Sequence, residues 1–359
     1  MNPEFWAGKR VLITGHTGFK GSWLSLWLQA LGANVAGYAL SPPTSPNLFE
    51  VARVGDGMHT CFGDLRDFNT LAGAIREMQP QIVIHMAAQS LVRYSYQNPI
   101  ETYAVNILGT VHLFEAIRKA GGVRVVINVT SDKCYENQEW VWGYRENDPL
   151  GGHDPYSTSK ACAELVTSAY RNTYFNHSIG LEQHGVALSS VRAGNVIGGG
   201  DWAEDRLISD IMRAMMTQRP VMIRNPNAIR PWQHVIGALS GYLMLAEKMW
   251  EDGPEFSGGW NFGPADEDAK SVQWIVEHMT SWWGEGASWR LEEEPQPHEA
   301  GWLKLDSAKA RTRLGWSLRW DVSTALYSII DWFRAYLRRE DMHDVVLKQI
   351  ASYAGHPEF

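Results

Sequence analysis

A tyrosine and a lysine four positions apart are the first residues in this sequence whose spacing suggests chemistry. They stand in the segment Asp154-Pro155-Tyr156-Ser157-Thr158-Ser159-Lys160, whose proline predicts the first turn of a helix. On a helix, Tyr156 and Lys160 share one face. An ammonium group beside a phenol favours the phenolate, so we expect Lys160 to lower the pKa of Tyr156 toward the range of a general base. Taken alone, the pair also fits an ordinary helix surface.

A second reactive segment, Ser131-Asp132-Lys133, follows an apolar run that ends at Val129. The hydroxyl of Ser131 could orient a substrate hydroxyl beside Tyr156. Asp132 and Lys133 add an acid and a base, which hydride transfer does not need. Elimination of water needs both, because one group protonates the leaving hydroxyl while another removes a carbon-bound proton. A surface turn with an incidental ion pair is the alternative.

A glycine-rich loop follows the first predicted strand. It reads Gly15-His16-Thr17-Gly18-Phe19-Lys20-Gly21 and leads into a predicted helix. Glycines at this spacing allow a tight turn and let the backbone approach a pyrophosphate at the helix N-terminus. A purely structural turn is the alternative. The residues expected to contact a dinucleotide here are Gly15, Thr17, Gly18, Phe19, Lys20 and Gly21.

Further positions for a dinucleotide lie at the ends of the next predicted strands. The segment after the second strand, 37–43, holds neither an acid for a ribose 2′-hydroxyl nor an arginine for a 2′-phosphate, which favours NAD over NADP. Asp64 could accept from the adenine amino group while Leu65 packs on the ring. His85 is expected to make a core hydrogen bond. The remaining expected cofactor contacts are Ala87, Ala88, Gln89, Tyr156 and Lys160.

The elements that position these residues alternate between short apolar runs and amphipathic stretches, a pattern typical of a parallel sheet with crossover helices. Strands are predicted at 10–14, 34–38, 58–62, 82–86, 123–129 and 186–192. Helices are predicted at 21–31, 71–78, 100–120, 156–175, 207–217, 235–250 and 326–337. We predict an α/β fold, a doubly wound parallel Rossmann sheet with a smaller C-terminal α/β substrate-binding portion.

The predicted domains interleave along the chain. Residues 1–197 and about 231–257 are assigned to the dinucleotide-binding domain. Residues of about 198–230 and 258–359 are assigned to the substrate-binding domain, because loops rich in Gly, Pro, Trp and acidic residues begin after Gly198.

Composition narrows the class of protein. The formal net charge is −8, and no cluster of Lys and Arg suggests a nucleic acid or an anionic membrane as a partner. The cysteines Cys61, Cys134 and Cys162 show no C-x-x-C spacing, so we expect neither a disulfide framework nor a metal site. No signal-peptide pattern or run of about 20 apolar residues is seen, which favours a cytoplasmic enzyme.

In this order, the motifs resemble those of the extended short-chain dehydrogenase/reductases that act on nucleotide-diphospho-sugars, over nearly the whole chain. Within that family the sequence is most similar to the CDP-glucose 4,6-dehydratases. The glycine loop and the Tyr156/Lys160 pair are common to the superfamily. The distinguishing segment is Ser131-Asp132-Lys133, because dTDP-glucose 4,6-dehydratases carry Thr-Asp-Glu there.

The resemblance implies a mechanism with bound NAD as an internal hydride carrier. Tyr156 would take the proton of the C4 hydroxyl while hydride leaves C4. Lys133 would then remove the C5 proton and Asp132 would protonate the C6 hydroxyl as water leaves, after which the hydride returns to C6. Lys133 can act as a base only as a neutral amine, a form that burial and the nearby cation of Lys160 would favour.

The resemblance also implies a set of substrate contacts. Asn195 matches an asparagine that meets the diphosphate, Arg230 matches an arginine of an Arg-Asp-x-x-x-Val motif with Pro231 in place of the Asp, and Asn261 matches a nucleotide-contacting asparagine. The segment 297–301 lacks the arginines that many relatives place on the diphosphate. The expected substrate-binding residues are Gln89, Ser90, Arg93, Asn195, Arg230, Asn261 and His298.

Three functions remain open: a CDP-glucose or other sugar-nucleotide 4,6-dehydratase of deoxysugar and O-antigen synthesis, a 4-epimerase or reductase, and a non-catalytic dinucleotide sensor. The intact Tyr156/Lys160 pair disfavours the sensor, and Asp132-Lys133 disfavours the epimerase. Relatives pair the helices at 100–120 and 156–175 in a four-helix bundle, so we expect a homodimer or a dimer of dimers. Val111, Phe114, Ala161 and Leu165 would suit that interface or the interior of one subunit.

Overall fold

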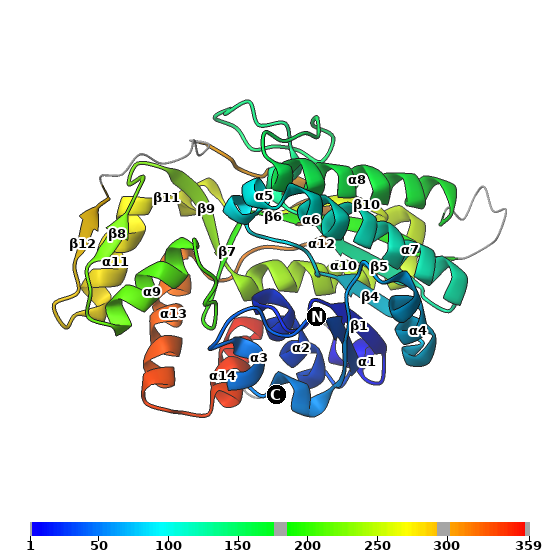
Figure 1. Cartoon of the computed structure of the whole chain (residues 1–359), viewed down its shortest axis with the longest axis horizontal. Coiled ribbons are helices and arrows are strands. Elements are labelled where there is room, and N and C mark those ends of the chain that lie inside the picture. Colours follow the sequence, from blue (N-terminus) through cyan, green and yellow to red (C-terminus); the bar gives the residue numbers. More distant parts are fainter. Residues whose placement is uncertain (1, 176–184, 293–301, 356–359) are drawn as a thin grey trace.

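The computed structural model describes residues 2–175, 185–292 and 302–355 (Figure 1). Within these ranges seven parallel strands form one large sheet in the order β10-β6-β5-β4-β1-β2-β3. Their bounds are β1 Arg10–Thr14, β2 Asn34–Ala39, β3 His59–Phe62, β4 Ile82–His85, β5 Val125–Val129, β6 Ala187–Ala193 and β10 Gly258–Phe262.

The predicted Rossmann sheet is confirmed, but the expectation of six strands was wrong by one. The seventh strand, β10, pairs in parallel with β6, with Gly258 opposite Ser189 and Phe262 opposite Ala193. It comes from the segment after residue 257, whose two leading glycines resemble a turn in the sequence. The large sheet therefore draws a strand from the part of the chain that the sequence assigned to substrate binding.

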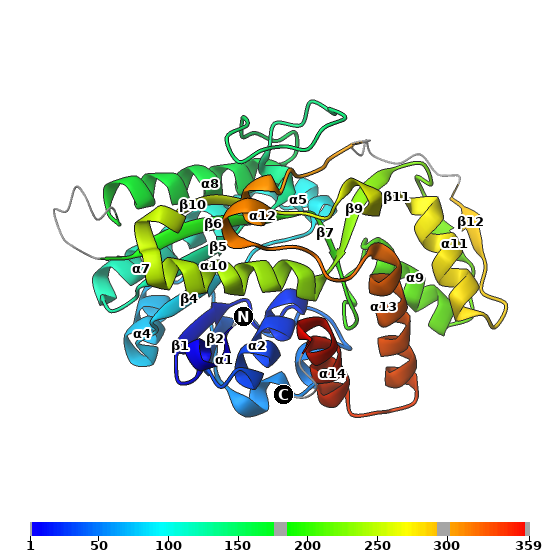
Figure 2. The same cartoon turned by 180° about the vertical axis from the view of Figure 1, so that it is seen from behind.

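Helices cover both faces of the large sheet (Figures 1 and 2). Helices α2 Phe19–Ala30, α10 Val235–Phe256 and α14 Met342–Ala354 share one apolar core with Val11 and Ile13 of β1. Helices α4 Phe68–Met78, α7 Gly109–Ala120 and α8 Pro155–Thr173 pack on the other face, in a second core with Leu12. Successive residues of β1 thus enter opposite cores, because side chains alternate along a strand.

The smaller portion lies beyond the carboxyl ends of the large sheet (Figure 1). Its strands form two small sheets, β11-β9-β7 and β12-β8. They are β7 Asn195–Ile197, β8 Val221–Ile223, β9 Ile229–His234, β11 Ala269–Ser271 and β12 Trp289–Leu291. Its helices are α9 Leu207–Met216, α11 Val272–Trp283 and α13 Val322–Leu337, whereas α12 Ala308–Leu314 packs against α10 and β10 of the large sheet. One continuous apolar core joins this portion to the face of the large sheet that α2 and α10 cover.

The remaining elements are short. The helices among them are α1 Pro3–Trp6, α3 Leu48–Val51, α5 Val92–Gln97 and α6 Pro99–Tyr103, with 3₁₀ turns at Val54–Gly57, Asp132–Cys134 and Asp266–Asp268. The single helix predicted at 100–120 is instead α6, a π-helical turn Ala104–Leu108, and α7. Within the described ranges, no helix combines the length and apolar character needed to cross a membrane.

Candidate active site

The segments predicted to carry chemistry meet at the carboxyl ends of the central strands. The glycine loop follows β1, the Ser131-Asp132-Lys133 turn follows β5, and Tyr156 begins α8. Because β1, β4 and β5 are parallel neighbours, all three segments leave the same edge of the sheet. This edge is where open α/β sheets bind their ligands.

The glycine loop leaves no room for a side chain at Gly15 or at Gly21. Gly15 has φ +79°, and a Cβ there would lie 2.7 Å from the backbone nitrogen of Ala87. A Cβ on Gly21 would lie 2.1 Å from the carbonyl oxygen of Gly15. Gly18 is the N-cap of α2, and no side chain of the described residues caps that N-terminus. The amides of the first turn can therefore meet an anion.

The other expected cofactor positions lie around this loop. Thr17 is buried, and its hydroxyl donates to the carbonyl of Leu40 just after β2 (2.9 Å). Asp64 forms an ion pair with Arg66 (2.6 Å), and hydrogen bonds from the side chain and the backbone N–H of Arg66 lower the pKa of the carboxyl group. Leu65 is buried in the second core. Phe19, Ala87, Ala88 and Gln89 are partly exposed.

His85 has the core role predicted for it. Its Nδ1 lies 2.6 Å from Thr14 Oγ1, and its Nε2 lies 3.3 Å from Thr110 Oγ1. Burial, helped by the charge of Lys160, lowers the pKa of His85 to about 3, so the ring is neutral at physiological pH. A neutral ring that bonds to hydroxyl groups on both sides is a structural element of the sheet end.

Tyr156 is buried, with 7% of its surface exposed. Burial raises the pKa of its phenol, while the charge of Lys133 and a hydrogen bond with Ser131 oppose that rise. The expectation that Lys160 lowers the pKa of Tyr156 was therefore wrong. Lys160 directs its ammonium to the carbonyl of Val129 (3.4 Å), and burial lowers the pKa of Lys160 to about 8.

The acid and the base that the sequence suggested form an ion pair. Lys133 Nζ lies 3.3 Å from Asp132 Oδ1, which also accepts from the hydroxyl of Ser131 (3.0 Å). Asp132 is 1% exposed, and its Oδ2 has no hydrogen-bond partner among the described residues. Lys133 keeps 35% of its side chain exposed, so it is less buried than expected. Oδ2 is therefore a buried carboxylate oxygen that no described protein group uses.

Cations gather around these groups, and one of them, Arg206, was missed from the sequence. Arg206 is the N-cap residue of α9, where it pairs with Asp201 (2.8 Å) and donates to Ser90 Oγ (3.2 Å). Burial, together with the charges of Arg206, Lys160 and Lys133, lowers the pKa of Lys20 to about 7. Lys20 therefore lies close enough to Arg206, Lys160 and Lys133, and to the carboxylate of Asp132, for their charges to affect its pKa.

Asn106, in the π-helical turn, was also missed. Its side chain accepts from the backbone N–H of Gln89 (2.9 Å) and donates to the carbonyl of Gln89 (2.9 Å) and to Ser159 Oγ (2.8 Å). Ser159 in turn donates to the carbonyl of Tyr156 (2.7 Å). One buried asparagine thus ties the loop after β4 to the start of α8. A polar residue in the middle of a predicted helix was the available signal.

Four of the expected substrate contacts lie at or beside this site. Asn195 opens β7, and its buried Oδ1 has no partner in the described part of the chain. Ser90 is exposed and bonds to Arg206. Arg93 pairs with Asp205 (3.4 Å), one residue before Arg206. Gln89 donates to the carbonyl of Leu91 (3.1 Å) and to Thr102 (2.9 Å), so its own loop holds its amide.

Two further expected substrate contacts, Asn261 and Arg230, lie on strands β10 and β9. Asn261 is fully buried on β10, where it accepts from the hydroxyl of Tyr135 (2.8 Å) and donates to the carbonyl of Tyr144 (2.8 Å). Its amide group is thus hydrogen-bonded to other segments of the protein. Arg230 lies on β9 and donates to the carbonyl of Ile229 (2.9 Å). His298 lies outside the described residues.

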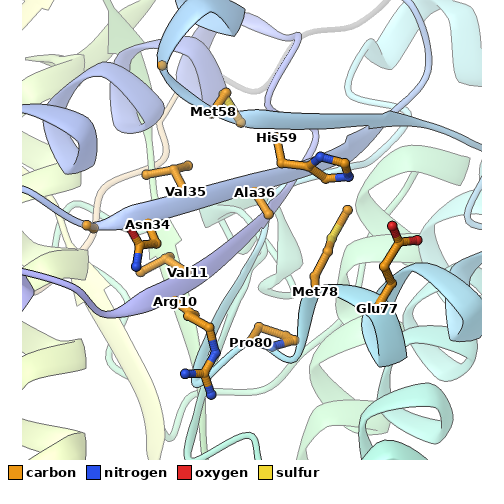
Figure 3. A pocket seen from close by; sticks show the side chains of 12 residues that line it. Arg10, Val11, Asn34, Val35, Ala36, Met58, His59, Glu77, Met78 and Pro80 are labelled. Carbon is orange, nitrogen blue, oxygen red and sulfur yellow. The ribbon is translucent and has the colours of Figure 1, made fainter.

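A hollow of about 480 Å³ lies at the opposite, amino ends of β1, β2 and β3 (Figure 3). Arg10, Asn34, His59 and Glu77 line it, together with apolar residues such as Met78, and these four polar side chains are exposed. No buried polar atom without a partner belongs to its lining residues. Despite its volume, the lining of this hollow therefore lacks the desolvated charged groups that are typical of reactive sites.

Comparison with known proteins identifies the family. The family model of GDP-mannose 4,6-dehydratase matches residues 12–328. The chain is 58% identical over 353 residues to the CDP-glucose 4,6-dehydratase of Salmonella typhimurium, covering 98% of each chain. The chain belongs to the GDP-mannose 4,6-dehydratase family. Membership of this family confirms the predicted resemblance to the extended short-chain dehydrogenase/reductases that act on nucleotide sugars.

Solved structures agree on the fold of this family member. A dTDP-glucose 4,6-dehydratase from Streptomyces venezuelae superimposes with a TM-score of 0.77 at 21% identity, covering 92% of this chain and 99% of that one. A UDP-glucose 4-epimerase from Thermus thermophilus superimposes with the same TM-score at 23% identity, covering 90% and 99%. One fold therefore carries both dehydratase and epimerase chemistry, so the reaction must be read from the site.

Proposed function

We propose that the protein is a CDP-glucose 4,6-dehydratase, a hydro-lyase that converts CDP-glucose to CDP-4-keto-6-deoxyglucose and water. The observation that carries this proposal is the Asp132–Lys133 pair beside the buried Tyr156. An epimerase or a sensor needs no such acid and base. The 58% identity to the Salmonella enzyme, over 98% of each chain, supports CDP-glucose as the substrate.

The proposed cofactor is NAD, and the residues present fit it. The pyrophosphate would meet the uncapped N-terminus of α2, where Gly15 and Gly21 leave no room for side chains. Lys160 would hold the nicotinamide ribose. The segment after β2 offers no arginine to a 2′-phosphate, which supports NAD over NADP. When bound, NAD would supply reversible hydride transfer, for oxidation at C4 of the sugar and for reduction at C6.

The protein's own residues move the protons. Tyr156 takes the proton of the C4 hydroxyl, and Ser131 orients that hydroxyl through the hydrogen bond it shares with Tyr156. Once C4 is a ketone, the C5 hydrogen is acidic and Lys133 removes it as a proton, then returns a proton to C5 when hydride is added at C6. Asp132 protonates the C6 hydroxyl through Oδ2, the oxygen that no described protein group uses.

The ion pair supplies both proton-transfer groups at once. Transfer of one proton from the Lys133 ammonium to the Asp132 carboxylate leaves a neutral amine and a carboxylic acid, the forms that elimination requires. A bound sugar displaces water from the partly exposed Lys133, and loss of water favours the neutral forms of both groups. The acidic and basic roles therefore do not depend on two independent titrations.

The substrate diphosphate is proposed to lie near Arg206 and Asn195. Arg206 has a raised pKa, because Asp201 lies beside it, so it stays cationic. With Lys20 and Lys160 it supplies the positive charge that the segment 297–301 lacks in its sequence. Charge-assisted hydrogen bonds to guanidinium groups are the usual way to hold a diphosphate.

The proposed domains interleave along the chain. Residues 1–197 and 231–257 bind the dinucleotide, with β10 completing their sheet, and residues 198–230 and most of 258–359 shape the substrate side. The free thiols of Cys61, Cys134 and Cys162 suit a reducing cytoplasm.

We further propose a homodimer through α6, α7 and α8. Ile100 on α6, Leu108 in the π-helical turn before α7 and Leu165 on α8 are 85%, 48% and 59% exposed. Phe114 and Ala161, two of the four apolar residues considered for an interface, are buried within the subunit. Leu165→Glu should therefore halve the mass measured by light scattering, and an unchanged mass would exclude this face.

The activity is tested with purified protein, CDP-glucose and NAD. We expect a 4-keto-6-deoxy sugar nucleotide, detected by its absorbance in alkali, without net NADH. dTDP-glucose, UDP-glucose and GDP-mannose serve as alternative substrates that test nucleotide preference. Absence of product with all four would refute the dehydratase assignment.

A further inference from the structure

A buried ion pair stands behind the reactive groups. Glu164 lies one turn after Lys160 on α8, and Arg192 lies on β6; their side chains are 3% and 4% exposed. Two N–H groups of Arg192 donate to the carboxylate of Glu164, each at 2.8 Å. A bidentate pair fixes the orientation of both partners, so it sets the position of α8 against β6.

Glu164 also reaches the beginning of the acid–base turn. Its carboxylate accepts from the hydroxyl of Thr130 (2.5 Å) and from that of Ser190 (2.6 Å). Thr130 immediately precedes Ser131-Asp132-Lys133. The helix that carries Tyr156 and Lys160 is thereby joined, through one carboxylate, to the turn that carries the acid and the base.

Arg192 holds the other end of the same turn. Its Nη1 donates to the hydroxyl of Tyr135 (2.5 Å), which donates to Asn261 Oδ1 (2.8 Å). Tyr135 directly follows the 3₁₀ turn Asp132–Cys134. Gly259 makes room for the guanidinium group, since a Cβ there would lie 2.9 Å from Arg192 Nη2. Thr130 and Tyr135 therefore fix the turn on both sides of its reactive residues.

The pair is charged and fully hydrogen-bonded. Burial alone would raise the pKa of Glu164, but the hydrogen bonds and charge of Arg192, with the two hydroxyl groups, lower it below its usual value. A buried ion pair is often replaced by apolar residues of similar size at little cost in stability. Stability alone is thus a weak reason for these residues, and their hydrogen bonds to the turn indicate another.

We propose that Glu164 and Arg192 are positioning residues that hold the Asp132/Lys133 turn in register with Tyr156. The inference rests on the proposed function, in which oxidation at C4 uses Tyr156 while elimination uses Asp132 and Lys133. Tyr156 keeps independent supports, because Asp154 caps α8 and Asn106 holds Ser159. Loss of the pair should therefore slow elimination more than oxidation.

The first test replaces both charges at once, in the double variant Glu164→Leu/Arg192→Met, with wild type assayed in parallel. A displacement of about 1 Å costs on the order of a hundredfold in rate, so we expect kcat to fall about tenfold to a hundredfold with KM nearly unchanged. The diagnostic signal is enzyme-bound NADH, which should accumulate during turnover because the return of hydride waits for elimination. Wild-type kcat, or reduced kcat without accumulated NADH, would overturn the proposal.

A second pair of variants decides the matter if the double variant does not fold. Thr130→Val removes the bond to Glu164, whereas Thr167→Val removes a matched bond one turn further along α8, between Thr167 and Asn128 (2.8 Å). Only Thr130→Val should lower kcat and accumulate NADH. Equal behaviour of the two variants would overturn the proposal. Failure of the wild-type enzyme to convert CDP-glucose would instead refute the proposed function and this inference with it.

Discussion

The two ends of the seven-stranded sheet differ in what they bury. The amino ends of β1, β2 and β3 border the 480 Å³ hollow, whose polar side chains reach water. The carboxyl ends bury Tyr156, Lys160 and Asp132, and leave Asp132 Oδ2 and Asn195 Oδ1 without hydrogen-bond partners among the described residues. Desolvated charge and unpartnered polar atoms cost free energy, so they indicate function where an open hollow does not.

Among the substitutions that test this difference between the two ends of the sheet, Tyr156→Phe should have the largest effect on turnover. Removing one hydroxyl from the carboxyl end should lower turnover of CDP-glucose by about a thousandfold or more, because in the proposed mechanism this hydroxyl takes the proton from C4–OH. NAD binding, measured by calorimetry, should stay close to that of wild type. Near-normal turnover would remove Tyr156 from its proposed role.

Asp132→Asn should have the next largest effect. The amide keeps the shape of the side chain but cannot exchange a proton with Lys133, so elimination should slow by about a hundredfold or more. Stopped-flow absorbance should show bound NADH forming at a rate close to that of wild type and decaying slowly. Loss of NADH formation itself would contradict the separation of oxidation from elimination.

Arg206→Met should mainly weaken substrate binding. Hydrogen bonds to charged groups contribute about 1.5–3 kcal/mol, so we expect KM for CDP-glucose to rise by about tenfold to a hundredfold. Arg338→Met is a matched control, because Arg338 forms an exposed pair with Glu340 at the end of α13. Equal KM values for the two variants would exclude Arg206 from the diphosphate site.

Acid should destabilise the carboxyl end through its buried histidines. Burial lowers the pKa of His16 to about 4 and that of His85 to about 3, from 6.5. Between these values the unfolded chain binds protons that the folded chain does not, so stability falls as pH falls below 6.5. The loss approaches about 1.4 kcal/mol per pH unit for each group. Urea unfolding at several pH values measures it, and His85→Asn should make the slope shallower; an unchanged slope would contradict the account.

The smallest effect is expected at the amino end. His59→Ala and Glu77→Gln alter the lining of the hollow, and both side chains are exposed. Steady-state kinetics with CDP-glucose should give kcat and KM within about twofold of wild type, since surface changes of this kind cost about 0.5 kcal/mol or less. A tenfold change in either constant would show that the hollow takes part in function.

Much of the fold could be predicted because its strands are continuous apolar runs. Val125–Val129 is buried at every position, which is typical of the centre of a parallel sheet. Strand β10 could not be recognised, because Gly258 and Gly259 resemble a turn and the room that Gly259 leaves for Arg192 appears only in three dimensions. The π-helical turn was hidden for a similar reason, since it depends on the bonds of Asn106 to other segments.

The site was partly predictable, because some of its residues follow spacing rules within a single segment. This is true of Tyr156, Lys160 and the glycine loop. Arg206 reaches the site from a loop between β7 and α9, and its partner Ser90 lies 116 positions earlier in the chain. For Asn261 the motif gives the position of the residue but not the direction of its side chain, which here points into a buried network.

The most direct test of the central claim follows one hydrogen atom. CDP-glucose deuterated at C4 is incubated with the enzyme and NAD, and the product is analysed by mass spectrometry and NMR. The account predicts one deuterium at C6 of the 4-keto-6-deoxy sugar and no net NADH, because the hydride leaves and returns within one bound complex. Deuterium found in released NADH, or a product that has kept it at C4, would contradict an internal dehydration at this site.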